Sequence, residues 1–294
     1  MKKLLFLLIL QFFIPRTSPG GELYFKFRSL RFEVTSNYDD NILRYSERDI
    51  DRFIDRTEIS PSKISTNDDW KNDLRLKFYF DGPKVLRKPI KFRYFFKYSS
   101  YLRNSFKNYL NHSVYISQEV GKIVDVELMY FNMPGYYLRE YNDKDINEYH
   151  SCDFDDERIR LDFSVKPIKQ TVIGLQFEFE TLYYNKYFTE YDSESRFLNL
   201  YVTQKIGKDF TVTGNYGFMK SDNVGYVPQV AAPEYPGIVE DSEYGDSSYD
   251  EDIYEISLRY RLRSESKKNT DFSLQYKLRN RFYTTDNTLE SDPF

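Results

Sequence analysis

Alternation of apolar and polar residues runs through much of the chain and predicts β-strands. In the stretch Thr171–Tyr184, Ile173 and Phe177 belong to an apolar row, whereas Glu178 and Glu180 belong to the opposite, mostly polar row. Successive side chains of a strand face opposite sides of the sheet, so this stretch presents one apolar and one polar face. A tilted strand of about 10 residues can cross a bilayer. We therefore expect a membrane-spanning strand here.

Ten further stretches repeat the pattern, which gives eleven predicted strands. The other ten are 23–35, 74–80, 90–98, 110–116, 124–130, 159–165, 198–202, 210–218, 254–262 and 272–282. In the first stretch Phe25 and Phe27 are apolar in the opposite phase to Leu30 and Phe32. A bulge near 28–29 would bring both halves onto one face.

Connection lengths alternate along the chain and favour a barrel. Long segments follow the first, fifth (up to Glu157) and ninth strands, and short turns follow the even-numbered strands. This is the arrangement of long extracellular loops and short periplasmic turns in outer-membrane barrels. The long loops are rich in acidic residues and the short turns in lysine, so charge separates along the barrel axis.

Eleven strands do not close such a barrel, because bacterial single-chain barrels contain an even number. The segment Asp286–Phe294 shows no alternation. We expect either that a closing twelfth strand lies outside these 294 residues or that one strand is miscounted.

The amino-terminal residues predict export. Lys2 and Lys3 precede an apolar run, Leu4–Leu10, and Pro15 ends the apolar segment. This is typical of a secretory signal peptide, which we place at residues 1–20, with the barrel domain at 21–294. The single cysteine, Cys152, excludes an internal disulfide framework and a multi-cysteine metal site.

Composition agrees with a barrel. Aromatic residues make up 18% of the chain, with 28 Tyr and 25 Phe, and barrels carry aromatic girdles at both membrane interfaces. A mean hydropathy of -0.67 argues against membrane-spanning helices but is compatible with strands in which every second residue is polar.

The signal peptide, amphipathic strands and aromatic strand ends resemble those of Gram-negative outer-membrane β-barrel proteins over essentially the whole mature chain. The resemblance implies an all-β, antiparallel up-and-down transmembrane barrel of about twelve strands, located in the outer membrane. Expected partners are membrane lipid, lipopolysaccharide and the barrel-assembly machinery. Twelve-stranded barrels include channels for acidic sugars, lipid-modifying hydrolases and translocator domains, so the resemblance leaves the function open.

Charged residues at inward positions are the candidate pore lining. They are Arg31, Arg75, Lys77, Lys91, Arg93, Asp125, Glu127, Arg158, Arg160, Glu178, Glu180, Arg259, Arg261, Arg279 and Arg281. Bases gather on the first three and last two strands and acids lie opposite, which predicts a transverse field across a wet pore. Alternatively, these charges pair with one another and fill the lumen.

The first long loop contains a helix signal. Ser46 and Asp49 fit a capping box, and Ile50, Phe53 and Ile54 follow at helical spacing. This helix could enter the barrel mouth as a constriction or lie across the rim.

Signals for catalysis are weak. The two histidines are His112, on the apolar-facing phase of a strand beside Ser113, and His150, placed in a loop beside Ser151. Neither arrangement resembles a nucleophile and its base. We expect no catalytic residue, cofactor, metal site or nucleic-acid partner. The leading hypothesis is a passive, porin-like channel for small polar or charged solutes; the alternatives are a structural or adhesive surface barrel and, less favoured, an outer-membrane lipid hydrolase.

Overall fold

A single antiparallel sheet dominates the computed structural model, which describes residues 25–43, 47–55, 63–143, 148–225, 248–263 and 269–284. Its strands are β1 (Lys26–Asp39), β2 (Asp69–Val85), β3 (Lys88–Tyr101), β4 (Tyr109–Val120), β5 (Val124–Asp143), β6 (Glu148–Ile168), β7 (Thr171–Tyr184), β8 (Ser193–Ile206), β9 (Phe210–Asn223), β10 (Tyr249–Arg263) and β11 (Asn269–Tyr283). Three short helices lie in connections: α2 (Glu47–Ile54), η1 (Ser105–Lys107) and η2 (Thr189–Tyr191).

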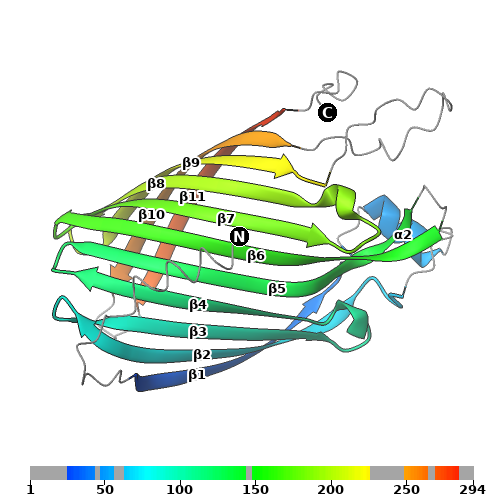
Figure 1. Cartoon of the computed structure of the whole chain (residues 1–294), viewed down its shortest axis with the longest axis horizontal. Helices are drawn as coiled ribbons and strands as arrows, with labels where there is room; N and C mark the ends of the chain where they lie inside the picture. The colour runs from blue at the N-terminus through cyan, green and yellow to red at the C-terminus, as the bar shows by residue number, and fades with distance from the viewer. Residues whose placement is uncertain are drawn as a thin grey trace, which may run out of the picture.

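Each strand pairs with its neighbour in sequence, so the order is β1 to β11 without crossovers. Figure 1 shows the sheet curling, with β10 and β11 passing behind the strands in its middle. The eleven strands and the up-and-down topology confirm the predicted fold class, and β7 spans the residues that the alternation marked. The proposed signal peptide and the segment after residue 284 lie outside the described residues.

The predicted bulge in β1 is present. The register shifts between Phe27 and Ser29, and Phe27 pairs with Phe80 while Leu30 pairs with Phe78. The rings of Phe27 and Phe80 lie 5.6 Å apart. The extra residue therefore returns the two halves of β1 to one face, as the change of phase required.

The sheet is not closed in the part of the chain that the structure describes. There β1 pairs only with β2, and β11 pairs only with β10. In an up-and-down sheet the first and eleventh strands run in the same direction, so they cannot pair antiparallel with each other. A further strand that runs in the opposite direction could pair with both β1 and β11. The predicted twelfth strand therefore stays a prediction.

The predicted long loop between the fifth and sixth strands is wrong. β5 contains 20 residues and β6 contains 21, compared with 14 for β7, and only 144–147 separate the two. Six further residues extend a strand by about 20 Å, so the pair continues beyond its neighbours as a hairpin. Register shifts between Met133 and Tyr136 and between Tyr137 and Arg139 break the strict alternation here, which explains why the pattern was not visible in the sequence.

Turn geometry at the other end is tight. The connections are 86–87, 121–123, 169–170 and 207–209, and Gly121 (φ 67°) and Gly207 (φ 65°) supply the left-handed backbone that such turns need. We call this end of the sheet the inner mouth and the end with the long connections the outer mouth.

Candidate functional site

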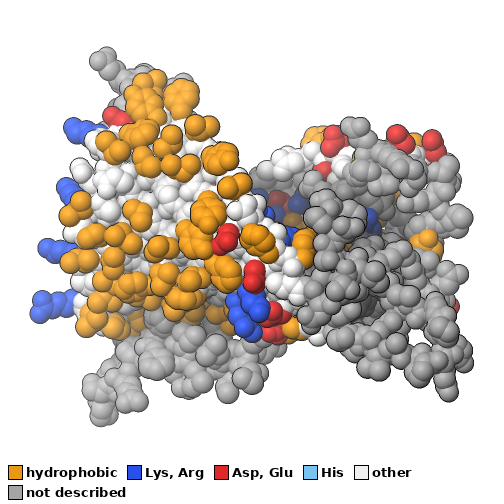
Figure 2. Space-filling view, turned by 90° about the horizontal axis from the view of Figure 1, so that it is seen from above, with side chains coloured by type: hydrophobic (Ala, Val, Ile, Leu, Met, Phe, Trp, Pro, Cys, Tyr) orange, Lys and Arg blue, Asp and Glu red, His pale blue; other side chains and the backbone are white. Residues whose placement is uncertain are grey.

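The polar face of the sheet collects the charged side chains. Cross-strand pairing joins Arg31 to Lys77 and Arg158 to Glu180, and residues directly opposite each other share a face. Following the register across the sheet places all fifteen candidate pore-lining residues on this face, which we call the inner face. The opposite, outer face carries exposed rows such as Phe32, Phe177 and Leu274. Figure 2 shows hydrophobic side chains gathered over the left half of the surface turned to the viewer.

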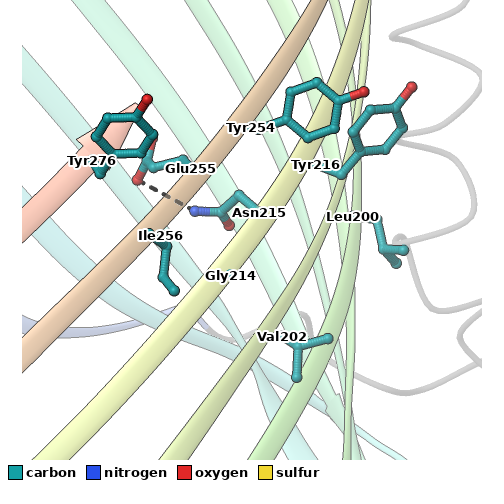
Figure 3. A pocket seen from close by; sticks show the side chains of 9 residues that line it. All are labelled: Leu200, Val202, Gly214, Asn215, Tyr216, Tyr254, Glu255, Ile256 and Tyr276. Atoms are coloured by element: carbon teal, nitrogen blue, oxygen red, sulfur yellow. Dashed lines mark hydrogen bonds between the residues drawn. The ribbon is translucent and has the colours of Figure 1, made fainter. Parts of the chain in front are cut away.

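The outer face has a shallow hollow at Gly214 (Figure 3), with a volume of about 480 Å³. Leu200, Val202 and Ile256 line it together with tyrosine rings. No atom lies within 4 Å of the position that a Cβ of Gly214 would occupy. The hollow results from a missing side chain on an apolar surface and contains no converging polar groups on that surface.

Ion pairs on the inner face lie within one strand, between adjacent strands or across an intervening strand. Lys77 Nζ lies 2.9 Å from a Glu33 oxygen, and Arg93 lies 2.5 Å from Glu127. Arg158 lies 2.7 Å from Glu180 and 2.6 Å from Asp156. Cross-strand opposite charges stabilise a sheet by roughly 0.2–1 kcal/mol each, so these pairs mainly fix side-chain positions.

The expected division into a basic and an acidic wall is wrong in detail. Asp73 lies 3.1 Å from both Arg75 and Lys97 within the basic sector. Glu251 lies near Arg279 and Arg281 at 3.9 and 3.6 Å. Sequence periodicity assigned each charge to a face, but the partner across the sheet depends on the register. The inner face is therefore a mosaic of pairs rather than two opposed walls.

Aromatic rings form an arc on the inner face near the outer mouth. The contacts run from Tyr109 through Tyr136, Phe154 and Tyr184 to Tyr191, with centroid distances of 5.0, 5.4, 5.3 and 5.6 Å. Sequence reasoning missed this arc because four of these rings, all but Tyr184, lie outside the predicted strands. The signal available was the aromatic density between residues 130 and 154.

The first long connection folds against the outer mouth. We call residues 40–43, 47–55 and 63–68 the lid segment. Its Ile42, Leu43 and Ile64 are buried in one hydrophobic cluster with Tyr101 and Tyr137 of β3 and β5. Figure 1 shows α2 beside the outer ends of β5 and β6.

The helix of the lid segment confirms the predicted helix start and spacing. Phe53 of α2 is half-buried and packs against the hydrophobic cluster, whereas Ile54 is exposed. Lys63 bridges to Glu140 of β5 at 3.3 Å and hydrogen-bonds Ser151 of β6. The lid segment is therefore joined to the extended β5–β6 hairpin as well as to β3.

Polar contacts fix the base of the lid segment. Asp69 is buried, and its carboxylate accepts hydrogen bonds from the backbone N–H groups of Trp70, Arg103 and Asn104. The Asn104 side chain donates to Asp69 and accepts from the Ser65 N–H at 2.8 Å. A carboxylate that accepts several N–H bonds is a strong anchor, so the two connections at this end are held together.

Both histidines lie in strands, His112 in β4 and His150 in β6. His150, Ser151 and Cys152 lie in β6 rather than in the predicted loop. The His150 ring stacks on Tyr187 at 3.7 Å, and Ser151 donates to Glu140. His112 lies on the outer face, opposite Phe96 and 6.2 Å from the Tyr94 ring, as its phase predicted.

No group of His, Cys, Asp or Glu among the described residues is arranged to hold a metal ion. No helix in the described part of the chain is long and apolar enough to cross a membrane.

Comparisons with known proteins bear on the fold alone. No family model and no curated protein matches the chain. OmpT of Vibrio cholerae, an outer membrane protein solved in a trimer form, is similar with a TM-score of 0.42 and 6% identity, over 92% of this chain and 93% of that one. Its loop L8 deletion mutant is similar with a TM-score of 0.40 and 7% identity, over 88% and 99%. No residue or activity carries over at such identities.

Proposed function

We propose that this chain is an outer-membrane β-barrel that acts as a passive channel for small polar or charged solutes, with the lid segment narrowing its outer mouth. One observation supports this most directly. In the middle of the sheet, on β5 and β6, the inner-face charges keep access to solvent: the side chains of Glu127 and Arg160 are each 29% exposed. Charges packed into a filled lumen would lose this access, because burial removes their hydration.

The lid segment explains how such a channel would exclude large solutes. Its buried cluster packs against Tyr109, the first ring of the aromatic arc, and its polar anchor at Asp69 and Asn104 fixes its base. Half-buried rings and paired charges then line the remaining passage. A small polar solute can pass such a surface with weak contacts at several points, which permits both entry and release.

Conductance in planar bilayers tests the proposal. The full-length protein is refolded, its folding is checked by heat-modifiable gel migration, and currents are recorded under a salt gradient. We expect small, steady unitary currents. Ile64→Asp places a charge in the buried cluster and should raise the conductance by loosening the lid segment. Ile54→Asp is the matched control, because Ile54 is exposed on α2 and its change should leave the conductance unaltered.

A structural or adhesive surface barrel is the second candidate. The specific observation that favours it is the β5–β6 hairpin, which extends beyond its neighbours and is tied to the lid segment. Folded protein that carries no current, with or without Ile64→Asp, would overturn the channel and favour this candidate.

A further inference from the structure

A basic cavity of about 410 Å³ lies at the inner mouth, where β8, β9 and β10 meet. It is lined by Lys205, Lys208, Asp209, Phe210, Thr211, Arg259 and Arg261. Three strands and the turn between β8 and β9 supply these residues, so the sheet itself positions the site.

The register aligns the basic groups in one row. Lys205 pairs with Thr211, and Thr211 pairs with Arg259, so the three side chains share the inner face. Adjacent strands lie about 4.8 Å apart, which places the backbones of Lys205 and Arg259 about 10 Å apart. Both side chains are long enough to reach a group bound above the Thr211 hydroxyl.

Asp271 of β11 orients the two arginines without using all their donors. Its carboxylate lies 2.5 Å from an Arg259 Nη and 2.9 Å from Arg261 Nε. Each guanidinium carries five N–H donors, so most remain available. The side chains of Arg259 and Arg261 are 55% and 44% exposed, which leaves these donors open to solvent.

Among the described residues at this cavity, positive charge exceeds negative charge. Four basic side chains face two carboxylates, those of Asp209 and Asp271. Among the described residues Lys205 has no carboxylate within ion-pair distance. By contrast, the cavity lined by β3 to β6 at the same mouth contains Lys91 and Lys166, and these lysines pair with Glu119 and Asp125.

We propose that this cavity, the inner basic site, binds the oxyanion of a small solute, a phosphate or carboxylate group. The proposal rests on the channel function and gives that channel a preference for anionic solutes. A guanidinium can donate two parallel N–H bonds to the oxygens of an oxyanion, and a lysine ammonium adds positive charge. The Thr211 hydroxyl adds a further donor. The site lies where a solute leaves the lumen, so it raises the local concentration of anions there.

Calorimetric titration of the refolded, full-length protein tests the site directly. Inorganic phosphate is one probe and acetate is the other, which separates phosphate from carboxylate preference. We expect saturable binding of at least one probe. Lys205→Gln and Arg259→Gln should each weaken it about tenfold, the loss of one charged hydrogen bond. Arg259→Lys should recover part of the affinity, because it restores the charge without the fork.

Lys169→Gln is the matched control, because Lys169 is an exposed turn lysine at the same mouth and lies outside the cavity. Equal weakening by this control would show diffuse surface attraction and overturn the site. Bilayer currents of the same variants, measured beside the titrations, separate the two proposals. Binding without current retains the site and refutes the channel, whereas current without binding retains the channel and refutes the site.

Discussion

Gly174→Ala should destabilise the barrel, because the Tyr201 ring lies directly over Gly174 on the inner face. A Cβ at this position would sit 2.1 Å from Tyr201 Cζ and 2.4 Å from Tyr201 Oη. The two residues are a cross-strand pair between β7 and β8. The Tyr201 hydroxyl reaches across β7 and donates a hydrogen bond of 3.0 Å to Asp162 of β6. One methyl group must therefore displace the ring and lengthen this hydrogen bond.

The expected loss is about 2–3 kcal/mol of unfolding free energy. Overpacking a filled position costs about 1–3 kcal/mol, and a hydrogen bond to a charged group contributes about 1.5–3 kcal/mol. Part of each cost relaxes, because Tyr201 is half-buried and its ring can swing toward the lumen. The expected loss of unfolding free energy is therefore smaller than the sum of the upper limits of these two costs.

Urea unfolding in lipid vesicles measures this loss, with the fluorescence of Trp70, the single tryptophan, as the signal. Gly214→Ala is the matched control, since no atom lies within 4 Å of the Cβ that it would add. The double variant Gly174→Ala, Tyr201→Ala should have nearly the same unfolding free energy as Tyr201→Ala alone, because the ring that the added methyl group would displace is absent. If Gly174→Ala and Gly214→Ala have the same midpoint, the packing of Tyr201 over Gly174 does not contribute to stability and the reasoning fails.

Three further predictions concern the faces and ends of the barrel. Phe177→Arg should impair membrane assembly, because an arginine on the lipid-facing side near the midplane costs roughly 2–4 kcal/mol; gel migration after refolding into vesicles measures it. Asp69→Ala should cost about 2–3 kcal/mol by leaving buried N–H donors without an acceptor, seen as faster amide exchange at the outer mouth. Hydrogen bonds from Lys91 and Lys88 lower the pKa of Glu119 at the inner mouth. These contacts stabilise the fold above the pH where a free glutamate titrates, and the contribution is lost as pH falls through the lowered pKa. Thermal midpoints of wild type and Glu119→Gln should therefore converge in acid.

Each of these has a control within the chain. Gln176→Arg changes the neighbouring position on the inner face and should assemble normally, and equal impairment would contradict the facing of β7. Asp69→Asn keeps one acceptor oxygen and should be milder than Asp69→Ala. A constant difference in thermal midpoint between Glu119→Gln and wild type down to acid pH would rule out the proposed ion-pair contribution.

Much of the architecture could be predicted from residue order alone. A strand that separates lipid from water must alternate, so Ile173 and Phe177 could be assigned to one face and Glu178 to the other before any fold was known. The change of phase between Phe27 and Leu30 likewise required a bulge, and the capping box at Ser46 and Asp49 predicted α2.

Prediction failed where alternation breaks or where partners come from distant segments. The bulges in β5 hid the extended hairpin, because a shifted register removes the period on which the assignment depends. The pairing of Asp73 with Lys97 depends on the stagger between β2 and β3, which local sequence does not specify. The inner basic site likewise needs Lys205 and Arg259, separated by more than fifty residues, to meet across β9.

Residue order therefore assigned side chains to the lipid face or to the lumen face, because facing is a local property of a strand with a period of two. The folded chain was needed to show which charges pair, how the lid segment packs against Tyr109, and where positive charge exceeds negative charge among the described residues. Those features depend on register and on chain folding between distant strands, and neither leaves a periodic signal in the order of residues.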